Sequence, residues 1–380
     1  MKKKIDYYCY IRAIACLAVV LVHLSVGAAT IFAADASRSQ ILLTNCIYNN
    51  MMWAVPCFLM VSGALLLAPG KILTGKKIFQ KYIMRMLLSI IIFTLLYEGL
   101  ELLVNGEAFS WERVGEGCLK ILTGESWSHM WYLYLMVGIY LMLPIYKIIS
   151  DHCQANLMRY LLLLLVLFLA IVPILKIWNI SSGFYIFTSV IYPFYFLAGG
   201  AISQGKLRLP AGCAVGMLVL GTIGVTVCSW LMICRGMSGL ALFTKYNSIF
   251  VILQSVGIFT IFQSAAEKAR QRAEEAVGKR FDEISNELSD GRLDGNVVDS
   301  KTKGGSLRVV KKILLWIDDC SFGIYLLHLI FIRGVLKHLP VTPYGNSGIW
   351  QMLGIYVGSI LCSYWITWLL KKIPAVRRIV

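Results

Sequence analysis

The segment CYIRAIACLAVVLVHLSVGAATIF, residues 9–32, is an apolar run of helix length that carries one arginine, Arg12, and one histidine, His23. The two lie eleven residues apart. On a helix of about 3.6 residues per turn they therefore differ by about 20° around the axis and about 16 Å along it. If this helix crosses a bilayer, Arg12 lies near one boundary of the hydrocarbon core and His23 near its middle. Ionisable side chains at that depth are costly to expose to lipid, so we expect both to face a polar cavity.

The whole chain shares the apolar character of this segment. Of its 380 residues, 58% are hydrophobic and 15% are charged, and the mean hydropathy is +0.72. This composition excludes an ordinary soluble domain. The net charge of +16 does not indicate nucleic-acid binding here, because the basic residues collect between apolar runs, where they orient the chain and meet anionic lipid. We therefore predict an all-α polytopic membrane protein in a lipid bilayer, with no nucleic-acid partner.

Apolar windows of span length predict a bundle of about ten transmembrane helices. They cover residues 9–33, 47–69, 83–104, 129–148, 159–177, 185–203, 211–233, 247–264, 316–338 and 349–370. We interpret the first as an uncleaved span, because the run has full span length and no clear cleavage site follows it. An even number of crossings places both termini on one side of the membrane.

The distribution of basic residues predicts which side that is. One set of connections holds sixteen lysines and arginines: Lys2, Lys3, Lys4, Lys71, Lys76, Lys77, Lys81, Arg85, Lys147, Arg159, Lys206, Arg208, Lys371, Lys372, Arg377 and Arg378. The opposite set holds eight: Arg38, Arg113, Lys120, Lys176, Arg235, Lys245, Arg333 and Lys337. The positive-inside rule therefore predicts that both termini are cytoplasmic.

Two stretches outside the spans have distinct compositions. Residues 265–312 hold eleven basic and nine acidic residues, and predict a charged cytoplasmic insertion, helical to about residue 288 and disordered beyond it. It divides the membrane domain into residues 1–264, with spans one to eight, and 313–380, with spans nine and ten. The outer connection, 105–128, mixes acidic and apolar residues and predicts an amphipathic surface helix, a structural reading we favour over acceptor binding.

Of the five histidines, His23 and His328 lie within apolar runs. His152 falls in a short cytoplasmic loop and His338 at an outer helix end, and both are interpreted as solvated, whereas His129 is interpreted as part of an interfacial aromatic belt. Histidine suits acyl transfer because its ordinary pKa lies near 6.5, so that it can accept a hydroxyl proton or attack an activated acyl group itself. Arginine stays charged and binds phosphate in a forked geometry. A phosphorylated acyl carrier from the cytoplasm would thus meet Arg12 first and reach His23 with its acyl end.

Three further groups complete the candidate site. Lys81 and Arg85 lie one turn apart at the start of the third span, and either set its topology or frame a phosphate site with Arg12. Ser321, Tyr325 and His328 have helical spacings of four and three, and therefore share one face, which we expect to line the cavity. Pro56 is expected inside a span, where it would favour a kink.

No metal site is predicted. The eleven cysteines are scattered, mostly in apolar segments, without the paired spacing of zinc ligands. They are interpreted as small buried hydrophobic residues.

Four segments carry a resemblance to a known family. They are Tyr10 to His23, with arginine, ten residues and histidine; VPCFLMVSG at 55–63; MWYLY at 130–134, followed by Gly138, Tyr140, Leu141 and Pro144; and SFGIYLLH at 321–328. In this order and spread over nine spans, they resemble the integral-membrane acyltransferase family 3, bacterial O-acyltransferases that modify cell-surface glycans.

The resemblance implies a function and a set of roles. It implies ten spans in a bacterial plasma membrane, a cytoplasmic acyl-CoA donor, usually acetyl-CoA, with no bound cofactor, and an acceptor hydroxyl on an envelope glycan or lipid-linked sugar. It maps the arginine of the family to Arg12 and its catalytic histidine to His23. The Arg-x-x-Arg pattern of the family is only approximated, since Arg85 fits but Tyr82 stands three positions earlier, beside Lys81.

Two alternatives come from other classes of protein. A transporter or flippase for a glycan or amphiphile could use Arg12 and His23 to bind an anion or relay protons. A scaffold could recruit envelope enzymes through residues 265–312. Cleavage of the acetyl-CoA thioester by the purified protein would separate an enzyme from a transporter, and deletion of residues 265–312 would test the scaffold.

Overall fold

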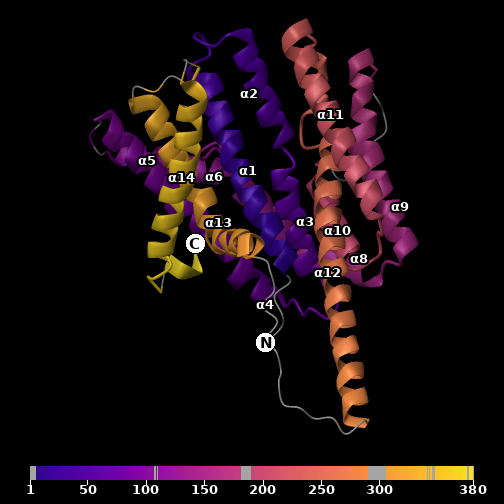
Figure 1. The fold of residues 1–380 in the computed structure, drawn as a ribbon. Coiled ribbons are helices and arrows are strands. Elements are labelled where there is room, and N and C mark those ends of the chain that lie inside the picture. Colours follow the sequence, from indigo (N-terminus) through magenta and orange to yellow (C-terminus); the bar gives the residue numbers. More distant parts are fainter. Residues whose placement is uncertain are drawn as a thin grey trace.

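The chain folds into a bundle of helices (Figure 1). The computed structural model describes residues 6–106, 108, 110–180, 190–289, 305–339, 341, 343–344, 347–374 and 376–379, and these contain helices and no strand. The α-helices are α1 Asp6–Ile31, α2 Arg38–Asn50, α3 Ala54–Leu66, α4 Gly75–Lys77, α5 Met84–Asn105, α6 Trp111–Thr123, α7 Trp131–Leu141, α8 Leu143–His152, α9 Ala155–Val166, α10 Tyr192–Ser203, α11 Ala211–Arg235, α12 Ile249–Ser289, α13 Gly305–His338 and α14 Gly348–Leu370. Shorter π or 3₁₀ segments are η1 Ile78–Ile83, η2 Leu167–Ile171, η3 Val172–Trp178, η4 Ser238–Phe243 and η5 Val376–Arg378.

Within the described ranges, eight helices are long and apolar enough to cross a membrane, or nine if the bent pair α7 and α8 forms one span. The all-α polytopic class is thereby confirmed. The bend of 56° falls where Pro144 enters the first turn of α8, because proline cannot continue the hydrogen bonding of α7.

In one predicted window the described helix is shorter than a full span. In residues 185–203 the described helix is α10, whose 12 residues reach about 18 Å, less than the hydrocarbon thickness. Residues 185–189 lie outside the described part of the chain.

Pro56 lies inside one candidate span, Arg38–Leu66, as expected. The helix of this span is interrupted by a turn at residues 51–53, between α2 and α3. This is the turn before Pro56, where a proline removes the hydrogen bond to the residue four positions earlier.

Helices α3 and α10 approach each other through glycine. A Cβ atom on Gly63 would lie 1.8 Å from the carbonyl oxygen of Phe196, and one on Gly199 would lie 2.0 Å from the carbonyl oxygen of Met60. Only glycine permits this contact of backbone with backbone, which resembles the small-residue packing common between membrane helices.

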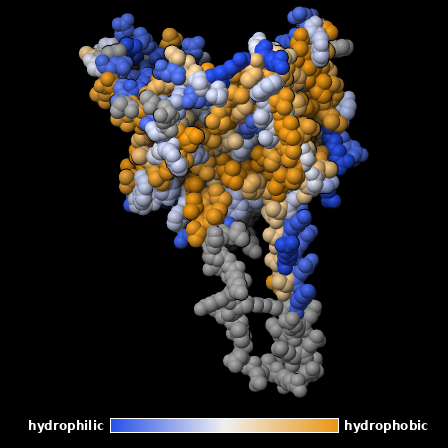
Figure 2. All heavy atoms as spheres, turned by 45° about the horizontal axis from the view of Figure 1, so that its top comes forward, coloured by the Kyte–Doolittle hydropathy of each residue, from blue (hydrophilic) through white to orange (hydrophobic). Residues whose placement is uncertain are grey.

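Helix α12 extends beyond the apolar bundle. The candidate membrane span in this helix is Ile249–Lys279, and the helix itself continues to Ser289. Residues 267–279 are exposed. Figure 2 shows hydrophobic side chains over much of the visible face of the bundle and hydrophilic ones along this projecting part. The expected disordered segment, residues 289 to 305, falls almost entirely in 290–304, outside the described residues. Helix α13 begins at Gly305, earlier than the window 316–338.

Helices α1, α13 and α14 pack together and position the candidate site. An ion pair joins Arg12 of α1 to Asp318 of α13, and a second joins Lys371, just after α14, to Asp319. The beginning of α1 and the end of α14 therefore lie near the same end of the bundle (Figure 1).

Candidate active site

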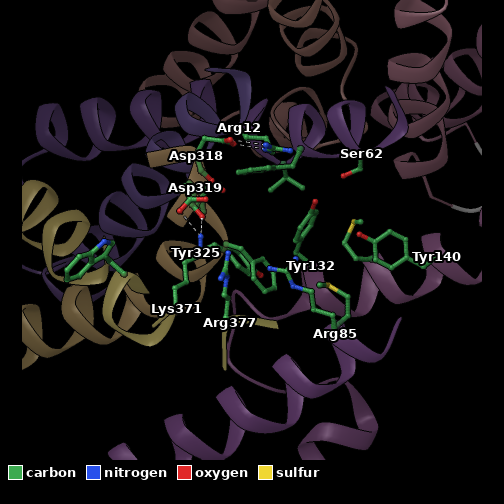
Figure 3. Close-up of a pocket in the computed structure, with 18 of the residues that line it drawn as sticks. Arg12, Ser62, Arg85, Tyr132, Tyr140, Asp318, Asp319, Tyr325, Lys371 and Arg377 are labelled. Carbon is green, nitrogen blue, oxygen red and sulfur yellow. Dashed lines mark hydrogen bonds and ion pairs between the residues drawn. The ribbon is translucent and has the colours of Figure 1, made fainter. Parts of the chain in front are cut away.

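A cavity of about 700 Å³ lies between α1, α3, α5, α7, α13 and the segment that follows α14. Its charged and polar lining residues are Arg12, Ser62, Arg85, Tyr132, Tyr140, Asp318, Asp319, Ser321, Tyr325, Lys371, Lys372 and Arg377 (Figure 3). Apolar side chains, among them Val19, Val55, Phe58 and Met136, complete the wall. The cavity thus has both charged and apolar surfaces and a volume typical of small-molecule sites.

Arg12 is held in this cavity by a forked ion pair. Its Nε donates to Oδ1 of Asp318 at 2.7 Å and its Nη2 donates to Oδ2 at 2.9 Å. The Asp318 side chain is 1% exposed and that of Arg12 is 28% exposed. A buried carboxylate needs such a partner, whereas the guanidinium keeps part of its surface toward the cavity.

A second ion pair lies beside the first. Lys371 Nζ donates to Oδ2 of Asp319 at 2.9 Å and also to the Asp319 carbonyl oxygen. Both carboxylates of the cavity are thus paired, Asp318 with Arg12 and Asp319 with Lys371.

Three more cations line the same cavity. Arg85 donates from Nε to the carbonyl oxygen of Ile379 at 3.2 Å and lies over the ring of Phe322. Lys372 lies over the ring of Trp368 at 3.6 Å, and Arg377 completes the group. Five basic side chains less two carboxylates leave an excess of three positive charges. Such a surface attracts a polyanionic ligand.

The structure places the predicted site residues in different positions. Arg12, Arg85, Ser321 and Tyr325 line the cavity, and the Ser321 hydroxyl donates to the carbonyl oxygen of Asp318 at 2.8 Å. Lys81 is exposed on η1 and lies outside the lining. The basic cluster is instead completed by the C-terminal residues Lys371, Lys372 and Arg377, which sequence reasoning assigned only to topology.

His23 and His328 lie beyond the inner end of the cavity and outside its lining. Their ring centroids are 5.1 Å apart. Val19, one turn before His23, and Tyr325, one turn before His328, both line the cavity. On α1 and α13, the last residues that line the cavity therefore precede the two histidines by about one helical turn, roughly 5.4 Å along the helix axis.

His129 joins the same cluster, so its interpretation as an interfacial side chain is wrong. It is 1% exposed, and its ring centroid lies 6.2 Å from that of His23 and 5.5 Å from that of His328. The Tyr325 hydroxyl donates to the His129 carbonyl oxygen. The neighbouring Trp131 and Tyr132 suggested a membrane interface, but α5 and α13 cover His129 through Tyr97 and Tyr325.

The three imidazoles, here named the histidine cluster, do not converge as metal ligands. Within the described ranges, no group of three or more His, Cys, Asp or Glu side chains could hold a metal ion. The chemistry open to the cluster on this geometry is proton transfer or nucleophilic attack.

A smaller cavity of about 320 Å³ lies between α5 and α6. Glu98 accepts from Lys120 at 2.8 Å through both carboxylate oxygens, and Glu101 and Arg113 also line it. The helix predicted in the outer connection is confirmed as α6, and the Glu98–Lys120 ion pair ties it to α5.

Comparison with known protein families gives a match over nearly the whole chain. A family model described as an acyltransferase domain, Acyl_transf_3, matches residues 5–368. No curated protein and no solved structure matches the chain.

Proposed function

The chain belongs to acyltransferase family 3, and on that premise we propose that it is an O-acetyltransferase of the bacterial plasma membrane. It moves an acetyl group from cytoplasmic acetyl-CoA to a hydroxyl of a cell-envelope glycan or lipid-linked sugar. The family match and the many apolar helices make it a multi-pass membrane acyltransferase. The donor, the acceptor and the roles below are our proposal.

The cationic cavity is the observation that supports a CoA donor. CoA carries a pyrophosphate and a 3′-phosphate at its nucleotide end and the thioester at the end of a flexible arm. Arg85, Lys372 and Arg377 supply the excess positive charge that such a nucleotide requires. Val19 and Tyr325 lie at the end nearest the histidine cluster, where the thioester would arrive.

His23 is the proposed catalytic group. Two routes fit its position. It accepts the proton of the acceptor hydroxyl as that oxygen attacks the thioester carbon, or its own nitrogen attacks that carbon, expels CoA and passes the acetyl group to the hydroxyl from an acetyl-imidazole. Arg12, fixed by Asp318, lies on the same helix and presents its partly exposed guanidinium to the donor.

Turnover of labelled acetyl-CoA by the purified protein in detergent tests this function. With an envelope glycan extract as acceptor, we expect release of free CoA and labelled glycan without any sealed compartment. A transporter would leave the thioester intact, and that result would contradict the proposal.

The donor site has its own test. We expect Lys372→Ala and Arg377→Ala each to raise the KM for acetyl-CoA about tenfold, because each removes one charge-assisted contact to phosphate. S-acetylpantetheine lacks these phosphates, so its KM should stay unchanged. Lys268→Ala, on the exposed part of α12, is the matched control. An equal rise in KM for both donors would contradict phosphate recognition.

A further inference from the structure

We propose that His328 is a second catalytic residue, the base that accepts the proton of the acceptor hydroxyl, and that this hydroxyl binds within the histidine cluster. The inference rests on the proposed function and goes beyond it, because it assigns the hydroxyl site and separates its base from His23.

The hydrogen bonding of His328 fixes its tautomer. Its Nδ1 lies 3.1 Å from the carbonyl oxygen of Ile324, one turn earlier on α13. A carbonyl oxygen only accepts, so Nδ1 of the neutral ring carries the proton and Nε2 carries a lone pair. Nε2 is buried and has no hydrogen-bond partner among the described residues, and the residue as a whole is 0% exposed.

The tautomer of His129 follows from its neighbour Tyr97. The Tyr97 hydroxyl donates its single proton to the carbonyl oxygen of Leu326 at 2.7 Å. At 3.5 Å from the same hydroxyl, Nε2 of His129 can therefore only donate, which leaves a lone pair on Nδ1. Nδ1 of His129 is likewise buried without a partner in the described part of the chain.

Two buried nitrogen acceptors of the histidine cluster thus have no donor among the described residues. Buried polar atoms are nearly always hydrogen-bonded, so such atoms in a native fold need an explanation. Their rings lie 5.5 Å apart, and each lies within 6.2 Å of His23. A ligand hydroxyl has one proton to donate and supplies the missing donor to Nε2 of His328, and the proposed reaction requires one such hydroxyl.

The chemical step balances with His328 as base. The hydroxyl proton moves to Nε2, the oxygen forms a bond to the acetyl carbon, and the bond from that carbon to its leaving group breaks. The leaving group is the His23 nitrogen, because with His328 as the base for the hydroxyl, His23 takes the second route above and carries the acetyl group after expelling CoA. The departing atom then takes the proton from Nε2, which restores the neutral ring.

His328→Asn is the variant that separates catalysis from packing. The asparagine amide keeps a donor for the Ile324 carbonyl oxygen but has no counterpart of Nε2. We expect an unchanged Kd for acetyl-CoA, an unchanged melting temperature in detergent and a kcat lowered about 10²-fold or more, the usual loss on removing a general base. Free imidazole should restore part of kcat in His328→Gly, because it can occupy the space left by the ring.

The exposed histidines give matched controls, since His152→Asn and His338→Asn should keep the wild-type kcat. The proposal is overturned if folded His328→Asn keeps more than a tenth of kcat, or if kcat falls only together with the melting temperature and imidazole restores nothing. Should the Asn variant not fold, His328→Gln is judged by the same criteria. A wild-type protein that never cleaves acetyl-CoA would instead overturn the proposed function.

Discussion

The ion pair of Arg12 and Asp318 joins α1 to α13 at the candidate site. The spacing of Arg12 and His23 on one apolar helix predicts that both avoid lipid, and they do face other polar groups.

Removing the charge of Asp318 tests this ion pair. Nothing in the sequence relates Arg12 to Asp318, because 306 positions separate them and only the packing of α1 on α13 brings them together. We expect Asp318→Asn to lower the stability of the protein by about 3 kcal/mol, because it leaves a largely enclosed guanidinium without its carboxylate. Thermal unfolding in detergent measures the change. The control is Glu116→Gln in the exposed pair of Arg113 and Glu116, whose loss should cost less than about 1 kcal/mol. Equal shifts for the two variants would contradict a structural role for the Asp318 pair.

Among the elements, the long apolar helices follow from composition, whereas the breaks between them do not. Window averages cannot distinguish a full span from the short buried helix α10, because both are apolar throughout. The cationic contribution of Lys372 and Arg377 to the cavity depends on how the chain folds back after α14.

The crossing of α3 and α10 gives a prediction at this scale. We expect Gly63→Ala to lower the melting temperature in detergent markedly, because its methyl group would overlap the backbone of α10. Gly358→Ala on α14 is the control, since nothing lies within 4 Å of a Cβ atom there. A Gly63→Ala protein as stable as the control variant would show that the two helices do not approach this closely.

For the whole molecule, the arrangement of helices places the beginning of α1 and the end of α14 near one end of the bundle. The bias of basic residues predicts that this end is cytoplasmic. We therefore expect alkaline phosphatase fused after Val380 to be inactive in cells, and the same enzyme fused after Gly124, which ends α6, to be active. The reverse pattern of activity would contradict the predicted topology, and would show that the donor enters from the opposite side of the membrane.

The proposed function is based on the position of the cationic cavity next to the histidine cluster. Substitution of His23 tests this function most directly. The measurement is thioester cleavage of acetyl-CoA by purified His23→Ala in the presence of the acceptor, with the Kd for acetyl-CoA determined on the same sample. We expect a folded protein that binds acetyl-CoA with wild-type affinity and shows no acetyl transfer above background. Full transfer activity in His23→Ala would contradict the assignment of His23 as the catalytic group.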